Sequence, residues 1–222
     1  MEVFKYFKEK SFKDDYLNGK IRLGTLNYYR GIENEKQGDV LEGISKYKVP
    51  YQEFDKTAWD EVIKVQPQFA QLVEVAEGGT VIMRDCETES YCHDEYIVCA
   101  TTVRNDDYFK EDFGEFCIKI EQPDFFCDLV ADQLCLKFKK DIRYINKPVS
   151  YTKVELTNFL QQQDPVFTKP KIPYEGQNEF RFFWLMNPLN DSGEQTLTID
   201  IGQHWAKKIF CRFEVKKLPG IF

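Results

Sequence analysis

The sequence predicts an α+β fold in a single domain, with mostly antiparallel, mixed sheets and short helices at the periphery. Segments with strand character outnumber those with helix character, and the two kinds do not alternate regularly as they would in a doubly wound parallel sheet. A chain of 222 residues can form one substantial core. Because 42% of the residues are hydrophobic and 15% are aromatic, we expect one packed domain over residues 1–222.

The strands are predicted from alternating or continuous apolar segments that end at turn residues. The strongest candidate, 96–103, is almost entirely apolar or β-branched, so we expect it to be central and buried on both faces. Pro50 should end one strand, and the acidic segment 85–95 should be a loop that follows another. The predicted strands are 2–7, 20–26, 44–50, 80–84, 96–103, 115–120, 136–145, 177–184, 195–201 and 209–215.

The helices are predicted to be short. Ser11 should cap a helix that runs through Leu17 and ends at Asn18-Gly19. The helical pattern in 59–75 is interrupted near Pro67, which favours two short elements. Further helices are predicted over 123–134, with Pro123 in the first turn, and over about 153–163, and His204-Trp205 should form a turn.

Charge and composition narrow the possible functions. The net charge of −7 and pI of about 5.1 argue against broad electrostatic attraction to nucleic acid or to acidic lipid. No apolar segment approaches the roughly 20 residues needed to cross a bilayer, and the start lacks the apolar stretch of a signal peptide. The seven cysteines contain no Cys-x-x-Cys pair, which favours buried thiols in a reducing compartment. We therefore expect a cytoplasmic protein with no membrane partner.

The segment 177–184 carries the clearest chemical signal. A strand here would point Gln177, Glu179 and Arg181 toward one face and apolar side chains toward the other. In one interpretation, Glu179 pairs with Arg181 or another cation and is structural. In the other, the Glu179 carboxylate lies in a cleft and stabilises positive charge on a sugar carbon, while Gln177 orients the substrate or nucleophile.

A second candidate site follows the strand 20–26. Tyr28 and Tyr29 are either part of a core corner or supply a flat face for a heteroaromatic ring. In the latter case, Arg22 or Arg30 would reach phosphate groups.

Metal and triad sites have weaker support. Asp39 and Glu42 lie beside glycines in a polar loop, where solvated charge is the first expectation and a two-carboxylate metal site the minor alternative. The spacing of Cys86, Cys92 and His93 matches no common zinc pattern. No Gly-x-Gly-x-x-Gly, phosphate-loop lysine or Ser–His nucleophile motif is present. We therefore predict no metal site.

Several short motifs resemble an uncharacterised bacterial domain family often found among defence and mobile-element genes. They are Phe4-Lys5-Tyr6, Asn18-Gly19, Gly38-Asp39-x-x-Glu42-Gly43, Lys171-x-x-Tyr174 and Glu179-x-Arg181. More distantly, the late Gln177-x-Glu179 is similar to the corresponding motif of ADP-ribosyltransferases.

The second resemblance implies a split core that holds NAD as the substrate. It implies that Glu179 is the catalytic acid, that Gln177 selects the acceptor and that Tyr28 or Tyr29 stacks on nicotinamide. The full set of residues expected to bind NAD is Lys5, Tyr6, Arg22, Tyr28, Tyr29 and Arg30.

The predicted function is an ADP-ribosyltransferase-like enzyme, a toxin or antiviral defence effector that modifies a nucleic acid or a protein. A neutralising antitoxin or a defence partner protein would accompany it. Two alternatives stay open: a non-enzymatic partner-binding module, and a metal-dependent nuclease that uses Asp39, Glu42 and Glu179.

Overall fold

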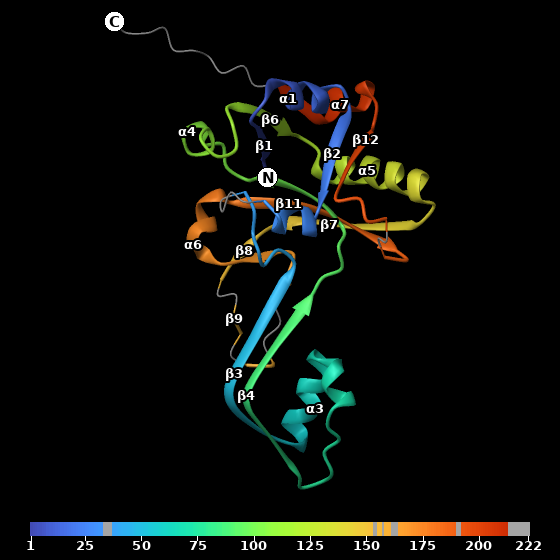
Figure 1. The fold of residues 1–222 in the computed structure, drawn as a ribbon. Helices are drawn as coiled ribbons and strands as arrows, with labels where there is room; N and C mark the ends of the chain where they lie inside the picture. Colours follow the sequence, from blue (N-terminus) through green and yellow to red (C-terminus); the bar gives the residue numbers. More distant parts are fainter. Residues whose placement is uncertain (33–36, 153–154, 157, 161–163, 190–191, 213–222) are drawn as a thin grey trace, which may run out of the picture. The chain divides into compact units, whose positions relative to one another are not determined.

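The computed structural model describes residues 1–32, 37–152, 155–156, 158–160, 164–189 and 192–212. It is a mixed α+β protein with a curled, largely antiparallel sheet, which confirms the predicted class (Figure 1). Contacts divide the chain into two compact units. Unit 1 comprises 1–40, 93–149 and 173–222, and unit 2 comprises 41–92 and 150–172. The single domain over 1–222 stays a prediction.

Unit 1 is built on a sheet in which all described strand pairs are antiparallel. Six strands lie in the order β12-β2-β5-β1-β6-β13, and β11 pairs with both β5 and β7. The predicted strand 96–103 is confirmed as the central β5, which has three strand partners. The strands are β1 (Val3–Phe7), β2 (Lys20–Thr25), β5 (Tyr96–Thr101), β6 (Phe116–Ile120), β7 (Asp141–Pro148), β11 (Glu179–Asn187), β12 (Thr196–Asp200) and β13 (Phe210–Arg212).

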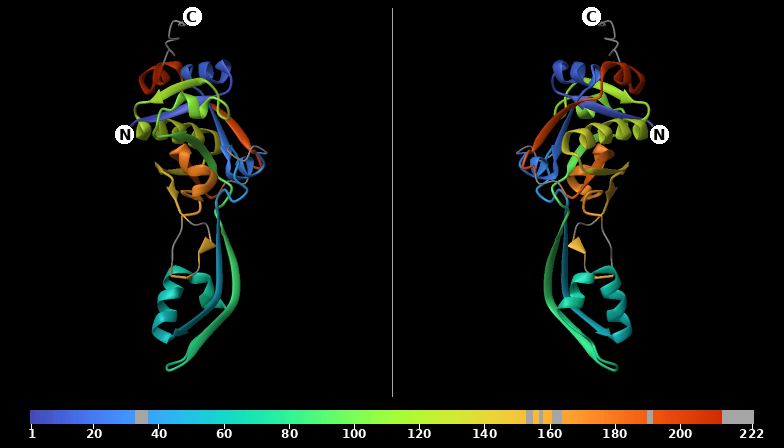
Figure 2. Two further views of the ribbon diagram at one scale, coloured as in Figure 1. Left: turned by 90° about the vertical axis from the view of Figure 1, so that its left-hand side faces the viewer. Right: turned by 90° about the vertical axis from the view of Figure 1, so that its right-hand side faces the viewer.

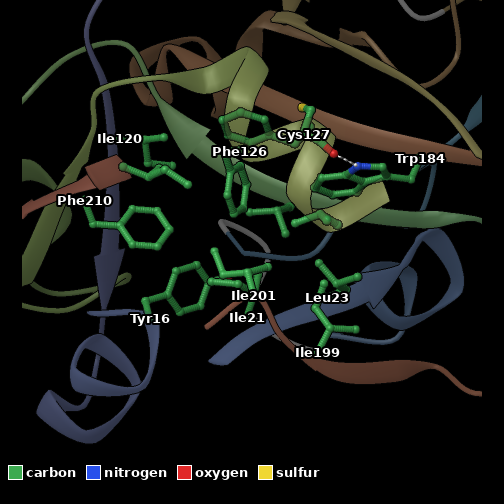
Figure 3. Packing of buried hydrophobic residues seen from close by; sticks show 14 of the residues in the cluster. Tyr16, Ile21, Leu23, Ile120, Phe126, Cys127, Trp184, Ile199, Ile201 and Phe210 are labelled. Atoms are coloured by element: carbon green, nitrogen blue, oxygen red, sulfur yellow. Dashed lines mark hydrogen bonds between the residues drawn. The ribbon is translucent and has the colours of Figure 1, made fainter. Parts of the chain in front are cut away.

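Helices cover the apolar face of this sheet. Helix α5 buries Phe126, Cys127 and Val130 against alternate residues of β11, including Trp184, whose indole N–H donates to the Cys127 carbonyl oxygen at 3.2 Å (Figure 3). Helices α1 and α7 pack against each other at one end of the unit (Figures 1 and 2). The helices of unit 1 are α1 (Lys10–Leu17), α2 (Leu26–Arg30), α4 (Asp106–Phe109), α5 (Pro123–Phe138) and α7 (Gln203–Ile209).

Unit 2 consists of a long hairpin with a small core of its own. Strands β3 (Ile44–Asp55) and β4 (Thr80–Tyr91) pair antiparallel, and β9 (Glu155–Leu156) pairs parallel with β3 (Figure 1). Helix α3 (Lys56–Val65) and the 3₁₀ helix η1 (Pro67–Gln71) confirm two elements separated near Pro67. Aromatic side chains dominate the core, among them Trp59 and Phe159. Strands β8 (Ser150–Tyr151) and β10 (Thr168–Lys169) form a further parallel pair.

Some predicted strand boundaries are wrong. Pro50 does not end its strand, because β3 continues to Asp55. The pairing of β3 with β4 passes from Val49 to Tyr51, so Pro50, which lacks a donor N–H, interrupts the ladder only locally. Of the acidic segment 85–95, predicted to be a loop, only 92–95 are one, because β4 extends to Tyr91. Lys46 and Lys48 across the hairpin pair with Glu89 and Glu87, which offsets that acidity.

Several helix predictions also need correction. Helix α1 begins at Lys10 with Glu9 as its N-cap, so Ser11 lies inside the helix. Helix α5 continues to Phe138, and the strand predicted from 136 therefore starts only at Asp141. Residues 155–156, predicted helical, form β9, while 153–154, 157 and 161–163 lie outside the described residues.

At the C-terminal end, the structure replaces a predicted turn with a helix. His204 and Trp205 belong to α7, and β13 starts at Phe210. The last predicted strand positions, 213–215, lie outside the described residues. Among the described helices, none combines the length and the apolar character that crossing a lipid bilayer requires.

Candidate functional site

The first residues of β11 place a buried ion pair on one face of the sheet of unit 1. Arg181 Nε donates to Glu179 Oε1 at 2.8 Å, and Nη2 lies 3.4 Å from Oε2. Arg181 is 0% and Glu179 4% exposed. Phe180 and Phe182 point the other way, into the apolar core. The predicted common face of Glu179 and Arg181 is therefore confirmed, as is their pairing.

Gln177 does not belong to this strand. It ends the 3₁₀ helix η2 (Glu175–Gln177), which follows the short helix α6 (Lys171–Tyr174), and Asn178 between it and β11 has φ of 44°. The period-two strand predicted from Gln177 is wrong, because the left-handed Asn178 interrupts it. Gln177 is nevertheless buried, at 5% exposure, one residue from the start of β11.

The central strand β5 is incompletely paired on one of its two edges. β11 pairs with β5 from Tyr96 to Thr101, so β1 and β2 must pair with the opposite edge of β5. On that edge, β2 pairs at residues 96–97 and β1 only at Thr101. The Cys99 carbonyl oxygen between them accepts a hydrogen bond from Lys5 Nζ at 2.9 Å. A side chain of β1 thus bonds β5 where the two neighbouring strands diverge.

Lys5 is held among aromatic rings near the Glu179 carboxylate. Its ammonium lies 5.6 Å from the Phe7 ring centroid and 5.8 Å from that of Tyr16. Burial lowers the pKa of Lys5, while Cys99 and the Glu179 carboxylate act in the opposite direction. Lys5 therefore lies within electrostatic reach of Glu179.

Tyr28 and Tyr29 lie on α2, directly after β2. Thr25 caps this helix by accepting a hydrogen bond from Tyr28 N. The two rings meet edge to face at 5.3 Å and lie against Gly24, where a Cβ would come within 2.8 Å of the Tyr28 ring and 2.9 Å of the Tyr29 ring. Loss of solvent contact raises the pKa of Tyr29 well above its ordinary value, and Cys99 and Glu179 add to this shift. Tyr29 therefore belongs to the same electrostatic environment as Lys5 and Glu179.

The predicted phosphate-binding arginines occupy different positions. Arg22 is exposed on β2, with its guanidinium 5.5 Å from the Tyr28 ring centroid and a 3.3 Å hydrogen bond to the Tyr28 hydroxyl. Arg30, in the last turn of α2, donates to the side-chain oxygen of Asn27. Arg22 thus presents a charged group beside the tyrosine pair.

Tyr6 takes part in a separate network. Its hydroxyl donates to Asp106 Oδ1 at 2.7 Å, and Asn105 N donates to it at 3.1 Å. The ring stacks on Phe109 with centroids 4.6 Å apart. Burial, followed by the Asp106 hydrogen bond, raises the pKa of Tyr6. The contacts of Tyr6 therefore tie β1 to α4, and the structure does not link Tyr6 to the Glu179 pair.

The acidic loop residues are buried, contrary to the expectation of solvated charge. Asp39, in unit 1, is 7% exposed. Glu42, in unit 2, is 3% exposed and lies 3.6 Å from the ammonium of Lys169, which is itself buried. Lys169 follows an unremarkable segment, and a buried cation there could not be predicted from its neighbours in sequence.

Two further observations bear on the nature of the site. Within the part of the chain that the structure describes, no three His, Cys, Asp or Glu side chains gather as metal ligands would. A hollow of about 380 Å³ in unit 1 is lined by Leu17, Gln203, Lys207 and Phe210, none of which was predicted as a site residue.

Thr101 is the main residue of the site that sequence reasoning missed. It ends β5 opposite Glu179 in the strand register, is 4% exposed, and donates from Oγ1 to the Gln177 carbonyl oxygen at 2.7 Å. A threonine at the end of a β-branched strand looks ordinary in sequence, and only the pairing of β5 with β11 gives it this position.

The structure thus brings Gln177 and Glu179 to Thr101 at the end of β5, and the Lys5 ammonium to the edge of β5 at Cys99. Tyr28 and Tyr29 pack on Gly24, with Arg22 beside Tyr28. No protein-family model matches the chain, and neither a curated protein nor a solved structure is significantly similar to it.

Proposed function

We propose that the protein is an ADP-ribosyltransferase-like enzyme that uses NAD as its substrate, with Glu179 as the catalytic acid. The observation that carries this proposal is the position of Glu179. Its buried carboxylate starts β11, next to the central strand whose opposite edge opens between β1 and β2. Lys5 on β1 and Tyr29, which follows β2, come from those two sides of the opening.

The chemistry suits this arrangement. Breaking the bond between ribose and nicotinamide leaves positive charge on the ribose carbon, and the bonding electron pair departs with nicotinamide. A fixed carboxylate near that carbon stabilises the charge more strongly in a water-poor site than in solvent. The acceptor then forms the new bond to the same carbon and loses a proton. Arg181, which fixes the carboxylate of Glu179, would keep it oriented during this step.

The other site residues would bind NAD. The tyrosine pair, Tyr28 and Tyr29, offers aromatic surface for nicotinamide. Arg22 is an exposed guanidinium suited to a phosphate oxygen, and Lys5 is a cation at the opening. Gln177 would select the acceptor, a nucleic acid or a protein, in a cytoplasmic toxin or antiviral defence effector whose partner is a neutralising protein.

A direct test is incubation of the purified protein with NAD, with calorimetry for binding and chromatography for released nicotinamide. The proposal predicts both binding and slow release without any added acceptor, because water can replace it. Absence of heat on titration together with intact NAD after prolonged incubation would contradict it.

A second candidate, a non-enzymatic partner-binding module, is favoured by the burial and pairing of Glu179 and Arg181. Both side chains are buried and bonded to each other, as expected for a structural ion pair. This candidate predicts a folded protein that never binds NAD.

A further inference from the structure

We propose that Thr101 is a positioning residue that sets the geometry of Gln177 and Glu179 for the reaction. This inference rests on the proposed function of Glu179. It concerns a side chain that takes no part in NAD chemistry itself and acts through the turn before β11.

The Thr101 hydroxyl connects two strands at their ends. Thr101 Oγ1 donates to the Gln177 carbonyl oxygen at 2.7 Å, and Thr101 Oγ1 also accepts a hydrogen bond from Val103 N at 3.2 Å. Because Thr101 also stands opposite Glu179 in the ladder, it contacts the residues on both sides of Asn178. A buried bond of this kind fixes the path of the backbone rather than merely adding stability.

The turn between Gln177 and Glu179 has an unusual backbone that is held by several hydrogen bonds. Asn178 adopts φ of 44° and ψ of 50°, a left-handed conformation that asparagine adopts more readily than most residues, and its Nδ2 donates to the Gly176 carbonyl oxygen at 3.2 Å. The Asn178 carbonyl oxygen accepts from Thr102 N at 2.9 Å and from Thr102 Oγ1 at 3.2 Å. The two threonines at the end of β5 therefore hold consecutive carbonyl groups of the turn.

A third contact involves Gly176, at the start of the turn. A Cβ on Gly176 would lie 2.7 Å from the Tyr108 hydroxyl oxygen, so this ring packs directly against the turn backbone. Tyr108 belongs to α4, and its N–H donates to the N-cap Asn105. Thr101, Thr102 and Tyr108, from the end of β5 and the segment after it, thus contact the turn at Gln177, Asn178 and Gly176.

Positioning has kinetic consequences because a reacting group must sit within about 0.5 Å of its productive geometry. Without the Thr101 hydroxyl, the Gln177 carbonyl loses its 2.7 Å hydrogen bond, and the backbone at Asn178 can relax. Gln177 and the first residue of β11 would then move together.

The test compares Thr101→Val, which keeps the shape and removes the hydroxyl, with Thr101→Ser, which keeps the hydroxyl. For nicotinamide release, Thr101→Val should lower kcat by roughly tenfold or more and change KM little, because a misplaced group slows chemistry without abolishing binding. Thr101→Ser should keep most of the wild-type kcat. Melting temperatures of both variants establish that they are folded at the assay temperature.

A second readout does not depend on activity. The backbone ¹³C and ¹⁵N chemical shifts of Asn178 in labelled protein report its left-handed conformation, and they should change in Thr101→Val and not in Thr101→Ser. Unchanged Asn178 shifts in Thr101→Val overturn the proposal, as does an unchanged kcat of Thr101→Val when the wild type is active. If the wild-type protein releases no nicotinamide, the proposed function fails, and the Asn178 shifts alone decide whether Thr101 sets the turn.

Discussion

Arg181 Nε lies 2.8 Å from Oε1 of Glu179, two residues earlier on the same strand, and both side chains are almost fully buried. The attraction between the two charges offsets the cost of removing each from water. The carboxylate proposed as catalytic is therefore also part of the fold.

Removal of either partner should destabilise the protein. Glu179→Gln and Arg181→Met should each lower the free energy of unfolding by about 3–5 kcal/mol, because each leaves one buried charge without its counterion. Urea denaturation followed by circular dichroism measures this. The double variant should recover much of the loss, and Glu175→Gln, at an exposed position just before the turn, is the matched control. Additive losses in the double variant would show that the two charges do not depend on each other.

The Glu42–Lys169 pair should behave in the same way within unit 2. Lys169→Met should lower the free energy of unfolding by about 3–5 kcal/mol, since Glu42 would stay buried without this cation. The exposed pair Lys56–Asp60 on α3 is the control, and Lys56→Met should cost only about 0.3–0.5 kcal/mol. Equal effects at both sites would contradict the burial of the Glu42 pair.

Gly24 should not tolerate a side chain. The Cβ of Gly24→Ala would overlap the rings of Tyr28 and Tyr29, so we expect a loss of about 1–3 kcal/mol of stability. Gly31→Ala, whose Cβ would meet only backbone oxygens at 3.6 and 3.7 Å, is the control. Thermal melts of the two variants should differ clearly, and a Gly24→Ala protein as stable as the wild type would show that the tyrosine pair is not packed on β2.

The burial of Cys127 should make the free energy of unfolding depend on pH. Burial raises the pKa of this thiol from 9.0 to about 12 in the folded protein. Between those values the unfolded chain loses the proton and the folded protein keeps it, so the thiol's contribution to stability is lost as pH rises from about 9 toward 12.

The stability advantage of the wild type over Cys127→Ala should therefore shrink across this range in urea titrations. Cys135→Ala, which removes an exposed thiol from the same helix, controls for alkaline thiol chemistry. A constant difference between wild type and Cys127→Ala from pH 8 to pH 11 would mean that Cys127 is not buried as described.

Local patterns predicted much of unit 1. The alternation in β1, the continuous apolar run of β5 and the Asn18-Gly19 end of α1 follow from side-chain periodicity and backbone freedom, which are local properties. The pairing of Glu179 with Arg181 was one of two interpretations of the sequence, because two residues at period two on a strand share a face.

The rest depended on tertiary contacts. Nothing near Pro50 indicates that β3 continues past it, because the partner strand β4 lies some thirty residues away in sequence. The burial of Glu42 involves Lys169, which is far more remote in sequence. The position of Thr101 depends on which strand pairs with β5, and a single sequence does not determine that pairing.

The stability loss expected for Glu179→Gln alters the design of the central experiment. Loss of activity in that variant has a meaning only if the protein is folded, and a lower melting temperature is expected whether Glu179 is catalytic or only structural. Lys169→Met supplies the needed control, since it should be destabilised to a similar extent while Glu179 stays intact.

The most direct measurement is therefore the rate of nicotinamide release from NAD by wild type, Glu179→Gln and Lys169→Met, at a temperature where all three are folded. We expect Glu179→Gln to lower kcat by roughly 10²-fold or more, as loss of an electrostatic stabiliser of the transition state does, and Lys169→Met to have a kcat close to that of the wild type. Release by folded Glu179→Gln at the wild-type rate would contradict the central claim that Glu179 is the catalytic acid.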